Sequence, residues 1–407
     1  MSYKKLGEYI QQVNNRNRDL EVETLLGVSI TKKLIPSIAN TIGTDMSVYK
    51  IIERGQFAYG TITSRNGDKI SIALLDEYAK ALVSQIYVVF EVKDQAELLP
   101  EYLILWFSRP EFDRYARFKS HGSTREAFDW EELCEVELPI PSIEKQRQIV
   151  AQYEAVTNKI KVNEAICEKL ETTAQALYKQ WFADFEFPNE QGQPYKSSGG
   201  TMVYHEELEK EIPEGWEVSS VGENFKISGG GTPKTEIEEY WKEGNILWYS
   251  PTDLTKSNSL FSKDTDKKIT KDGLKNSSAK LIPIDSVLMT SRATIGKVCF
   301  NEVESSTNQG FINILPHTVF SKYFIYCWIN DNLSTIYSLS TGSTFLEISK
   351  GSFNSIKFLK SENNDIYRLF NDLIAPLFFQ IKNIEFQTKK LTQLQSLLLS
   401  RLATLEG

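Results

Sequence analysis

The glycine-rich segment Gly230-Gly231-Thr232-Pro233-Lys234 offers several groups that can contact phosphate. Its backbone amides and the Thr232 hydroxyl can donate hydrogen bonds, and Lys234 adds a positive charge. A phosphate-binding P-loop is excluded, because the proline and lysine follow the glycines in an order that does not match Gly-Lys-Ser/Thr at the start of a helix. A tight turn that needs glycine for its conformation is an equally good interpretation.

Side chains suited to base edges stand further along the same half of the chain. Arg292 follows a predicted strand, and an arginine can donate to O6 and N7 of guanine, although a surface ion pair is the alternative. Asn308 and Gln309 carry amides suited to adenine, but a buried scaffold role is favoured for them. If the chain binds DNA, the candidate contacts in this half are Thr232, Lys234, Lys256, Lys267, Lys268, Arg292, Asn308, Gln309 and Ser343.

Loops between predicted strands in the N-terminal half hold further candidates for DNA contact. Gly122-Ser123-Thr124 in this half recurs as Gly342-Ser343-Thr344 in the other, so the two segments are expected to play the same part. Solvated surface charge is the simpler interpretation for the charged members of the set. The candidates are Lys32, Lys33, Arg65, Asn66, Lys69, Ser123 and Arg125.

Charge restricts how this chain could hold nucleic acid. The 407 residues include 46 basic and 54 acidic side chains, a formal net charge of -8, and neither half is basic. A protein that binds DNA mainly by neutralising phosphates should contain a basic domain. Any DNA binding must therefore depend on base-edge contacts, positive partners or local patches. One such patch comprises Lys256, Lys263, Lys267, Lys268, Lys271, Lys275 and Lys280.

Sequence patterns typical of catalysis, metal binding and membrane insertion are missing. The four cysteines and three histidines lie too far apart for a zinc finger or a disulfide framework. We find no cofactor-binding glycine motif after a strand and no nucleophile elbow. No apolar stretch approaches the roughly 20 residues that span a bilayer, and no signal peptide is evident. We expect a cytoplasmic chain with no catalytic residue, metal site, bound cofactor or membrane association.

Two long heptad runs must position these candidates, and they predict two helices of the same phase. We expect the helices to form one antiparallel coiled coil, with Asn163 and Gln380 as buried polar positions that fix its register. Pro376 should kink or interrupt the second helix. The predicted pairing residues are Ile149, Tyr153, Val156, Ile160, Asn163, Leu170 and Leu177 in the first run and Phe370, Leu373, Leu377, Gln380, Ile384, Leu391, Leu394 and Leu398 in the second.

The pattern upstream of each helix predicts a strand-rich α+β module, and the module is repeated. Short β-branched and aromatic runs alternate with turn residues, and Val83-Ser84-Gln85 corresponds to Thr307-Asn308-Gln309. Helices are expected at 101–117 and 321–337. With pseudo-two-fold symmetry and the modules at opposite ends of the coiled coil, the predicted domains are 1–142 (first module), 143–185 (central helix), 186–205 (linker), 206–361 (second module) and 362–407 (C-terminal helix).

Several short motifs together resemble the DNA-specificity subunit of type I restriction-modification systems. They are Ile212-Pro213-Glu214-Gly215-Trp216-Glu217, Gly230-Gly231-Thr232-Pro233, Thr307-Asn308-Gln309-Gly310, Leu138-Pro139-Ile140-Pro141 and Trp181-Phe182-Ala183-Asp184-Phe185. The resemblance covers nearly the whole chain, but the first module lacks the Pro-Glu-Gly-Trp-Glu and Gly-Gly-Thr-Pro motifs. Contacts in the first module therefore cannot be copied from the second.

The resemblance implies two target recognition domains that read the two parts of a split sequence in double-stranded DNA. It also implies a scaffold for two methyltransferase subunits and for restriction and translocase subunits, with S-adenosylmethionine, ATP and magnesium on those partners. Two other hypotheses remain: a two-headed protein-interaction adaptor without a DNA role, which the acidic composition permits, and a self-contained DNA-modifying enzyme. The bases that are read cannot be inferred from this sequence.

Overall fold

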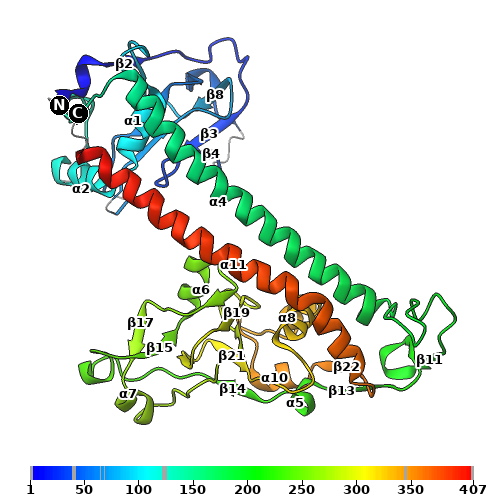
Figure 1. The fold of residues 1–407 in the computed structure, drawn as a ribbon. Helices are drawn as coiled ribbons and strands as arrows, with labels where there is room; N and C mark the ends of the chain where they lie inside the picture. Colours follow the sequence, from blue (N-terminus) through cyan, green and yellow to red (C-terminus); the bar gives the residue numbers. More distant parts are fainter. Residues whose placement is uncertain are drawn as a thin grey trace. The chain divides into compact units, whose positions relative to one another are not determined.

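The computed structural model describes residues 3–38, 43–64, 66–67, 69–121, 126–342 and 346–404. The chain divides into two compact units, of which unit 1 comprises Met1–Lys161 with Lys389–Gly407 and unit 2 comprises Val162–Thr388. Both units mix helices and strands, which confirms the predicted α+β class. The long helices α4 (Ile143–Tyr178) and α11 (Asp365–Arg401) each run from one unit into the other (Figure 1).

Unit 1 contains two four-stranded sheets that share a core. The first sheet is antiparallel and has the order β2 (Ile10–Val13), β9 (Val88–Val92), β6 (Phe57–Gly60) and β7 (Ser71–Leu74). The second has the order β4 (Leu34–Pro36), β3 (Leu25–Val28), β8 (Lys80–Val83) and β5 (Lys50–Glu53), with β3 and β8 parallel. Strand β1 (Tyr3–Lys5) pairs with β10 (Glu137–Pro139).

Unit 2 repeats this plan with additions. Its larger sheet has the order β14 (Ile227–Gly229), β21 (Phe311–Ile314), β18 (Val287–Thr290), β19 (Val298–Asn301) and β16 (Phe261–Ser262). The smaller has the order β17 (Lys267–Ile269), β15 (Ile246–Tyr249) and β20 (Ser305–Thr307). Two further pairs are β11 (Met202–His205) with β12 (Lys210–Pro213), and β13 (Trp216–Ser220) with β22 (Lys357–Ser361).

The connectivity confirms the predicted internal repeat. Strand β3 lies parallel to β8 and antiparallel to β4, and β15 has the same relation to β20 and β17. The order β2-β9-β6-β7 likewise corresponds to β14-β21-β18-β19. The two modules therefore share a core topology, although unit 2 adds β16 to its larger sheet and its smaller sheet ends at β20, where that of unit 1 continues to β5.

Short helices follow the sheets in both units. Pro100 and Pro110 stand at the first positions of α1 and α2, where the missing N–H costs nothing, and the Ser321 hydroxyl accepts the N–H of Phe324 at the start of α8. The α-helices are α1 (Pro100–Phe107), α2 (Pro110–Lys119), α3 (Trp130–Cys134), α5 (Val221–Asn224), α6 (Pro251–Ser257), α7 (Lys271–Lys275), α8 (Lys322–Asp331), α9 (Leu333–Ser338) and α10 (Lys350–Asn354). The remaining turns are η1 (Leu6–Glu8), η2 (Met46–Val48), η3 (Lys179–Ala183, a π-helix), η4 (Glu206–Leu208), η5 (Glu238–Tyr240) and η6 (Leu402–Thr404).

The single helices expected at 101–117 and 321–337 are wrong, because each segment forms two helices. Pro110 restricts the backbone of Arg109 to an extended conformation, so α1 ends and α2 begins there. In unit 2 the break between α8 and α9 falls at Asn332, which caps both helices. Figure 1 shows α8 close to α11, and the rings of Tyr323 and Phe378 stack 4.5 Å apart between them.

The segment predicted as a linker, residues 186–205, begins with buried aromatic packing. Phe187 is buried and stacks on Tyr195 and on Trp216, with ring centroids 4.6 and 5.5 Å apart. The Asn189 side chain accepts the N–H groups of Gln191 and Gln193, which closes the turn in between. The predicted domain boundaries stay predictions, but this segment is held by side-chain contacts within unit 2.

The antiparallel pairing of the long helices is confirmed. In unit 2, Asn163 of α4 donates to the Thr388 hydroxyl at 3.1 Å, while Tyr178 further along α4 contacts the earlier residue Phe370 of α11. In unit 1, Gln395 donates to the Thr157 hydroxyl at 2.7 Å. Asn163 is buried, so it is a polar position inside the seam as expected.

The pairing pattern holds for α4 and is shifted in α11. The apolar residues predicted for α4, from Ile149 to Leu177, are all at least half-buried. In α11 the buried residues after Phe370 include Ile374, Phe378, Ile381 and Ile384, whereas Leu373 and Leu394 are each 43% exposed. Gln380 is also exposed, so its prediction as a buried seam position is wrong. The half-buried residues Leu377, Leu391 and Leu398 stay near the seam.

The shift in α11 has a physical cause. A straight helix with 3.6 residues per turn drifts away from a strict heptad repeat. In addition, Phe378 packs on Phe300, Tyr323 and Tyr326 of the second module, so α11 buries a wider face than a two-helix seam would need. The helix also does not end at Pro376, which is exposed within the continuous segment Asp365–Arg401.

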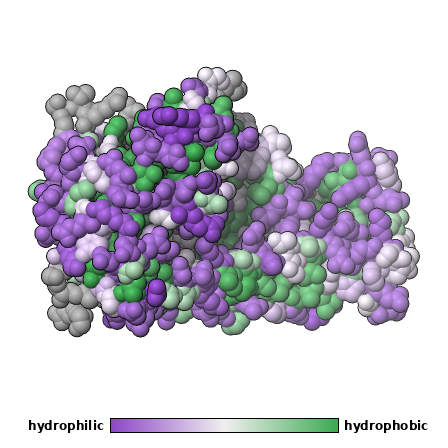
Figure 2. Space-filling view, turned by 90° about the horizontal axis from the view of Figure 1, so that it is seen from above, coloured by the Kyte–Doolittle hydropathy of each residue, from purple (hydrophilic) through white to green (hydrophobic). Residues whose placement is uncertain are grey.

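The surface agrees with the acidic, charged composition. The face drawn in Figure 2 is mostly hydrophilic, with hydrophobic side chains scattered between the polar ones. Among the described residues, no helix is both long enough and apolar enough to cross a bilayer. Both long helices carry charged side chains along their exposed faces.

Candidate nucleic-acid interface

The Gly230–Gly231 loop of unit 2 is tightly packed against the Thr307–Gln309 segment. A Cβ atom on Gly230 would lie 2.0 Å from the carbonyl oxygen of Asn308, so no other residue fits there. The Gly231 N–H donates to the Thr307 carbonyl at 2.9 Å, and the indole of Trp248 donates to the Gly231 carbonyl at 2.9 Å. Close packing, rather than a turn with positive φ, therefore explains these glycines.

Thr232 and Gln309 bring two of the predicted segments together. The Thr232 hydroxyl donates to Oε1 of Gln309 at 2.6 Å. Asn308 is half-buried, and its Oδ1 accepts the N–H of Gly310, which is the scaffold role favoured for it. Gln309 and Lys234 are exposed. The scaffold interpretation thus describes Asn308, whereas Gln309 is exposed and its Oε1 joins it to the loop that carries Thr232 and Lys234.

Arg292 lies next to this pair of loops. The Ser291 N–H donates to the Gly310 carbonyl at 2.8 Å, which joins the loop after β18 to the Asn308–Gly310 turn. The Arg292 side chain is 43% exposed and forms an ion pair with Glu347, Nε to Oε1 at 2.7 Å, although this N–H does not point at the oxygen. We call residues Thr232, Arg292 and Gln309 the recognition cluster of unit 2.

The lysine patch of unit 2 is less positive than its sequence suggests. Lys256 forms an ion pair with Asp266, and Lys268 forms one with Asp264 at 3.5 Å. The hydrogen bond with Asp266 raises the pKa of Lys256, so that lysine stays charged. Lys267 instead lies over the Trp241 ring, 5.6 Å from its centroid. A hollow of about 340 Å³ is lined by Thr235, Trp241, Asp266, Lys267 and Lys268.

The same loop arrangement recurs in unit 1. Ala127 forms isolated antiparallel β-bridges, which are backbone pairings, with Ile62 and with His121. In unit 2, Glu347 forms the same kind of backbone pairing with Arg292 and with Thr341. The loop after β6, of which residues 61–64, 66–67 and 69–70 are described, is therefore the counterpart of the loop that carries Arg292. Within it, the Asn66 amide donates to the Ile62 carbonyl and to the Ser71 hydroxyl, at 3.1 and 2.9 Å.

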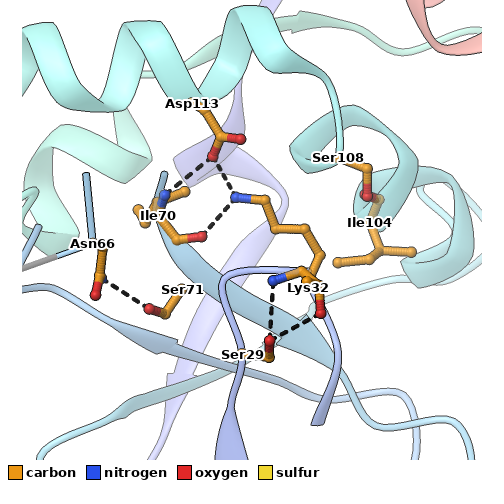
Figure 3. A network of polar contacts seen from close by, with 9 residues as sticks. Ser29, Lys32, Asn66, Ile70, Ser71, Ile104, Ser108 and Asp113 are labelled. Atoms are coloured by element: carbon orange, nitrogen blue, oxygen red, sulfur yellow. Dashed lines mark hydrogen bonds and ion pairs between the residues drawn. The ribbon is translucent and has the colours of Figure 1, made fainter. Parts of the chain in front are cut away.

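Lys32 differs from the solvated surface charge expected in the first module. Its side chain is only 8% exposed, and the ammonium donates to the Ile70 carbonyl and to Asp113 (Figure 3). Burial lowers the pKa of Lys32, while Asp113 opposes that shift. Lys33 and Lys69 are exposed, as expected for solvated charges. The remaining candidates Arg65, Ser123, Arg125 and Ser343 lie outside the described residues.

Two acidic side chains with structural roles in the modules were missed by sequence reasoning. Asp113 binds Lys32 and also accepts the Ile70 N–H at 3.1 Å. Glu385 of α11 accepts the Ser259 hydroxyl and the N–H groups of Leu260 and Phe261, at 2.6, 2.7 and 3.1 Å. Both stand on helices among many other charged residues, so nothing in the sequence singles them out. Among the residues placed by the structure, no cluster of acids, histidines and cysteines could hold a metal ion.

Comparison with known proteins gives one consistent result. The model of the type I restriction modification DNA specificity domain matches residues 36–172 and 213–395. The type I restriction enzyme MjaIX specificity subunit of Methanocaldococcus jannaschii is 31% identical over 325 residues, covering 75% of this chain and 68% of that protein. The HindI specificity subunit of Haemophilus influenzae is 26% identical over 405 residues, covering 87% of this chain and 86% of that protein.

A solved structure supports the fold. The crystal structure of the type I restriction-modification S subunit from M. genitalium aligns with a TM-score of 0.57 and 14% identity, covering 100% of this chain and 96% of that one. At this identity the likeness concerns the fold alone. The two matched copies of the specificity domain and the two related specificity subunits confirm the predicted resemblance and favour DNA recognition over the adaptor hypothesis.

Proposed function

This chain belongs to the type I restriction-modification DNA-specificity family, and we propose that it reads a split DNA sequence with two separate recognition domains. The observation that carries this proposal is the duplication of one module, with corresponding strand orders and with the same pair of isolated β-bridges beside the corresponding loop. Each module presents its own set of side chains in these loops. Two readers of different composition should recognise two different half-sites, with unread bases between them.

In the second domain we propose that the recognition cluster contacts base edges and the lysine patch contacts phosphates. Arg292 is 43% exposed and pairs with Glu347 at Nε, and its terminal guanidinium nitrogens would donate to guanine O6 and N7. The Gln309 amide nitrogen is a donor for a base or phosphate oxygen once its oxygen is engaged by Thr232. Lys234 and Lys267 are exposed and supply sequence-independent charge.

We propose that chemistry belongs to the partners of this chain. The relatives' names identify them as specificity subunits of type I restriction enzymes. By analogy, two methyltransferase subunits would bring S-adenosylmethionine, and restriction and translocase subunits would bring ATP and magnesium. The proposed domains are residues 1–142 and 206–361, with the helical segments 143–185 and 362–407 as the scaffold for these partners and 186–205 as the segment between.

Mapping of methylated DNA sites tests the proposal. The methylome of cells with the assembled system is compared with that of cells lacking only this chain. We expect one motif to vanish, and we expect it to consist of two specified parts with unspecified bases between them. An unchanged methylome would contradict a role in DNA recognition, and a continuous motif would contradict the two-reader model.

Replacement of Arg292 tests the second reader alone. Arg292→Ala should weaken or relax recognition only in the half-site read by residues 206–361, by about 1–3 kcal/mol if the guanidinium makes a bidentate base contact. The measurement is the same site mapping with the variant complex. Lys357→Gln, which removes a similarly exposed ion pair with Glu207, is the matched control and should leave the motif unchanged. If Arg292→Ala behaves like that control, Arg292 is only a surface ion pair.

A further inference from the structure

The buried ammonium of Lys32 lies where three parts of unit 1 meet (Figure 3). It donates to the Ile70 carbonyl at 2.6 Å and to Oδ1 of Asp113 at 2.5 Å, and that same oxygen accepts the Ile70 N–H at 3.1 Å. Asp113 stands in the first turn of α2, where a carboxylate is also favoured by the helix dipole. One lysine and one aspartate thus engage both backbone groups of Ile70.

The Lys32 ammonium joins the loop between β6 and β7 to the turn between β3 and β4. Ile70 ends the loop after β6, which is the counterpart of the Arg292 loop in the second module. Lys32 itself stands in the turn between β3 and β4, with the Lys32 N–H donating to the Ser29 carbonyl at 3.1 Å. On the other side of the loop, Asn66 donates to Ser71. Figure 3 shows Lys32, Ile70 and the Asn66–Ser71 pair grouped beneath α2.

Stability alone does not account for this arrangement. A buried ion pair recovers little net free energy after desolvation, and apolar residues of similar volume usually serve as well or better. Lys32 also holds a φ of 63°, a left-handed conformation that a side chain with Cβ adopts at a cost. Its burial further excludes Lys32 as a direct phosphate contact, since phosphate is reached from the exposed surface. What the pair supplies is directional bonding to one residue of a loop.

We propose that Lys32, together with Asp113, is a positioning residue that fixes the loop after β6 against the β3–β4 turn and so sets the base preference of the first recognition domain. This inference rests on the proposed function. It differs from a contact role, because Lys32 acts through Ile70 and through the loop whose exposed members include Lys69. It also predicts that stability and base preference can be separated by mutation.

The test uses single variants and one double variant in the assembled complex. Lys32→Met leaves Asp113 charged and buried, and Asp113→Asn leaves Lys32 without its anion, so each should lower the melting temperature of unit 1 by several degrees. The double variant Lys32→Met/Asp113→Asn removes both charges and keeps an oxygen for the Ile70 N–H. We expect it to recover most of the melting temperature while base preference in the first half-site falls about tenfold.

Controls separate positioning from general destabilisation. Gln146→Leu breaks buried hydrogen bonds to Glu97, Leu99 and Pro141, far along the chain from these loops, and serves as a variant of similar melting temperature. At matched melting temperature, a first half-site that degenerates in the Lys32 variants and stays sharp in Gln146→Leu supports the inference. Equal effects in both, or an unchanged first half-site in the double variant, would overturn it.

Mapping of methylated sites distinguishes failure of the positioning role of Lys32 from failure of the proposed split-site recognition. The second half-site should stay unchanged in every variant, because the residues altered all lie in unit 1. A wild-type complex that yields no split motif would contradict the proposed function itself. A wild-type split motif that survives loss of the Lys32–Asp113 pair would contradict only the positioning role.

Discussion

The two modules stabilise corresponding connections, between β3 and β4 in unit 1 and between β15 and β17 in unit 2, through different contacts. In unit 1 the turn between β3 and β4 is short and is fastened from inside by Lys32, which reaches Asp113 and Ile70 of its own module. In unit 2 the equivalent connection between β15 and β17 contains α6 and β16 and is fastened by Glu385 of the long helix α11. One sheet topology therefore accepts either support, from within the module or from α11, for a connection beside its candidate recognition loops.

The difference follows from length. A short turn can satisfy its backbone groups locally, as the Lys32 N–H does with the Ser29 carbonyl. The longer connection of unit 2 bends away after α6, where Asn258 has a left-handed conformation, and its next N–H groups lie at β16, an edge strand beside β19 that leaves some of its N–H groups in need of another acceptor. The Glu385 carboxylate accepts two of them, from Leu260 and Phe261. Asp253 closes the far end by accepting the Asp266 N–H at 2.8 Å.

Among the predicted substitutions, Glu385→Ala should have the largest effect on the stability of the connection between β15 and β17. The change leaves the N–H groups of Leu260 and Phe261 without an acceptor, which should destabilise the connection by about 2 kcal/mol. Hydrogen exchange of residues 258–262 should accelerate, while exchange of the β3–β4 turn in unit 1 stays the same. Glu385→Gln, which keeps one oxygen, is the control and should show a smaller change. Unaltered exchange in Glu385→Ala would mean that the connection does not depend on α11.

The support that Glu385 gives to the connection in unit 2 should depend on pH, and this effect should be smaller than that of removing the side chain. Burial raises the pKa of this carboxyl above its ordinary 4.5, and nearby Glu171 adds to the shift, while the hydrogen bonds from Ser259, Leu260 and Phe261 oppose it. The folded state then binds this proton more tightly than the unfolded state. Its contribution to the free energy of unfolding is therefore largest at low pH and falls as pH rises from 4.5 through the folded pKa.

Hydrogen exchange of residues 258–262 across this pH range, corrected for the intrinsic rate, measures the contribution of Glu385. Protection should decline with rising pH in the wild type and should be flat in Glu385→Gln, which cannot titrate. Protection that increases with pH in the wild type, and not in the variant, would show that the hydrogen bonds outweigh burial and that the pKa is lowered.

The helices show why part of this fold was predictable from sequence. In α4 most large apolar residues stand at one face, with Val162 as an exposed exception, so Ile149, Tyr153 and Leu170 mark the seam. In α11 leucine and phenylalanine occur on both faces, and Leu373 and Phe379 are exposed while Ile374 and Phe378 are buried. A heptad pattern cannot choose between such neighbours. Which of these residues are buried depends on the second module, whose Phe300 and Tyr323 pack on Phe378 of α11.

The candidate site, like the helices, was predictable from the sequence only in part. Loop chemistry identified Gly230, Thr232, Gln309 and Arg292, and the structure gathers their segments through local hydrogen bonds. The anchors were not predictable, because Lys32 and Asp113 are 81 residues apart. Their importance comes from burial and direction, and neither property is encoded by residue type or by spacing along the chain. Sequence therefore identified the loops that carry the candidate groups but not the residues that hold those loops in place.

The smallest expected effect concerns Lys267, on the strand that ends the long connection of unit 2. Lys267 is exposed and its ammonium lies over the Trp241 ring, which leaves its positive charge in place, so we expect it to be available to a phosphate. In the assembled complex, Lys267→Gln should weaken binding evenly across DNA sequences and reduce the slope of log affinity against log salt by about one. Lys268→Gln is the matched control, and its effect should be smaller because Asp264 already offsets part of its charge. If Lys267→Gln changes the preferred bases of the second half-site while the salt slope stays constant, this lysine reads sequence and does not act as a phosphate contact. That result would extend base readout from the recognition cluster to the connection supported by Glu385.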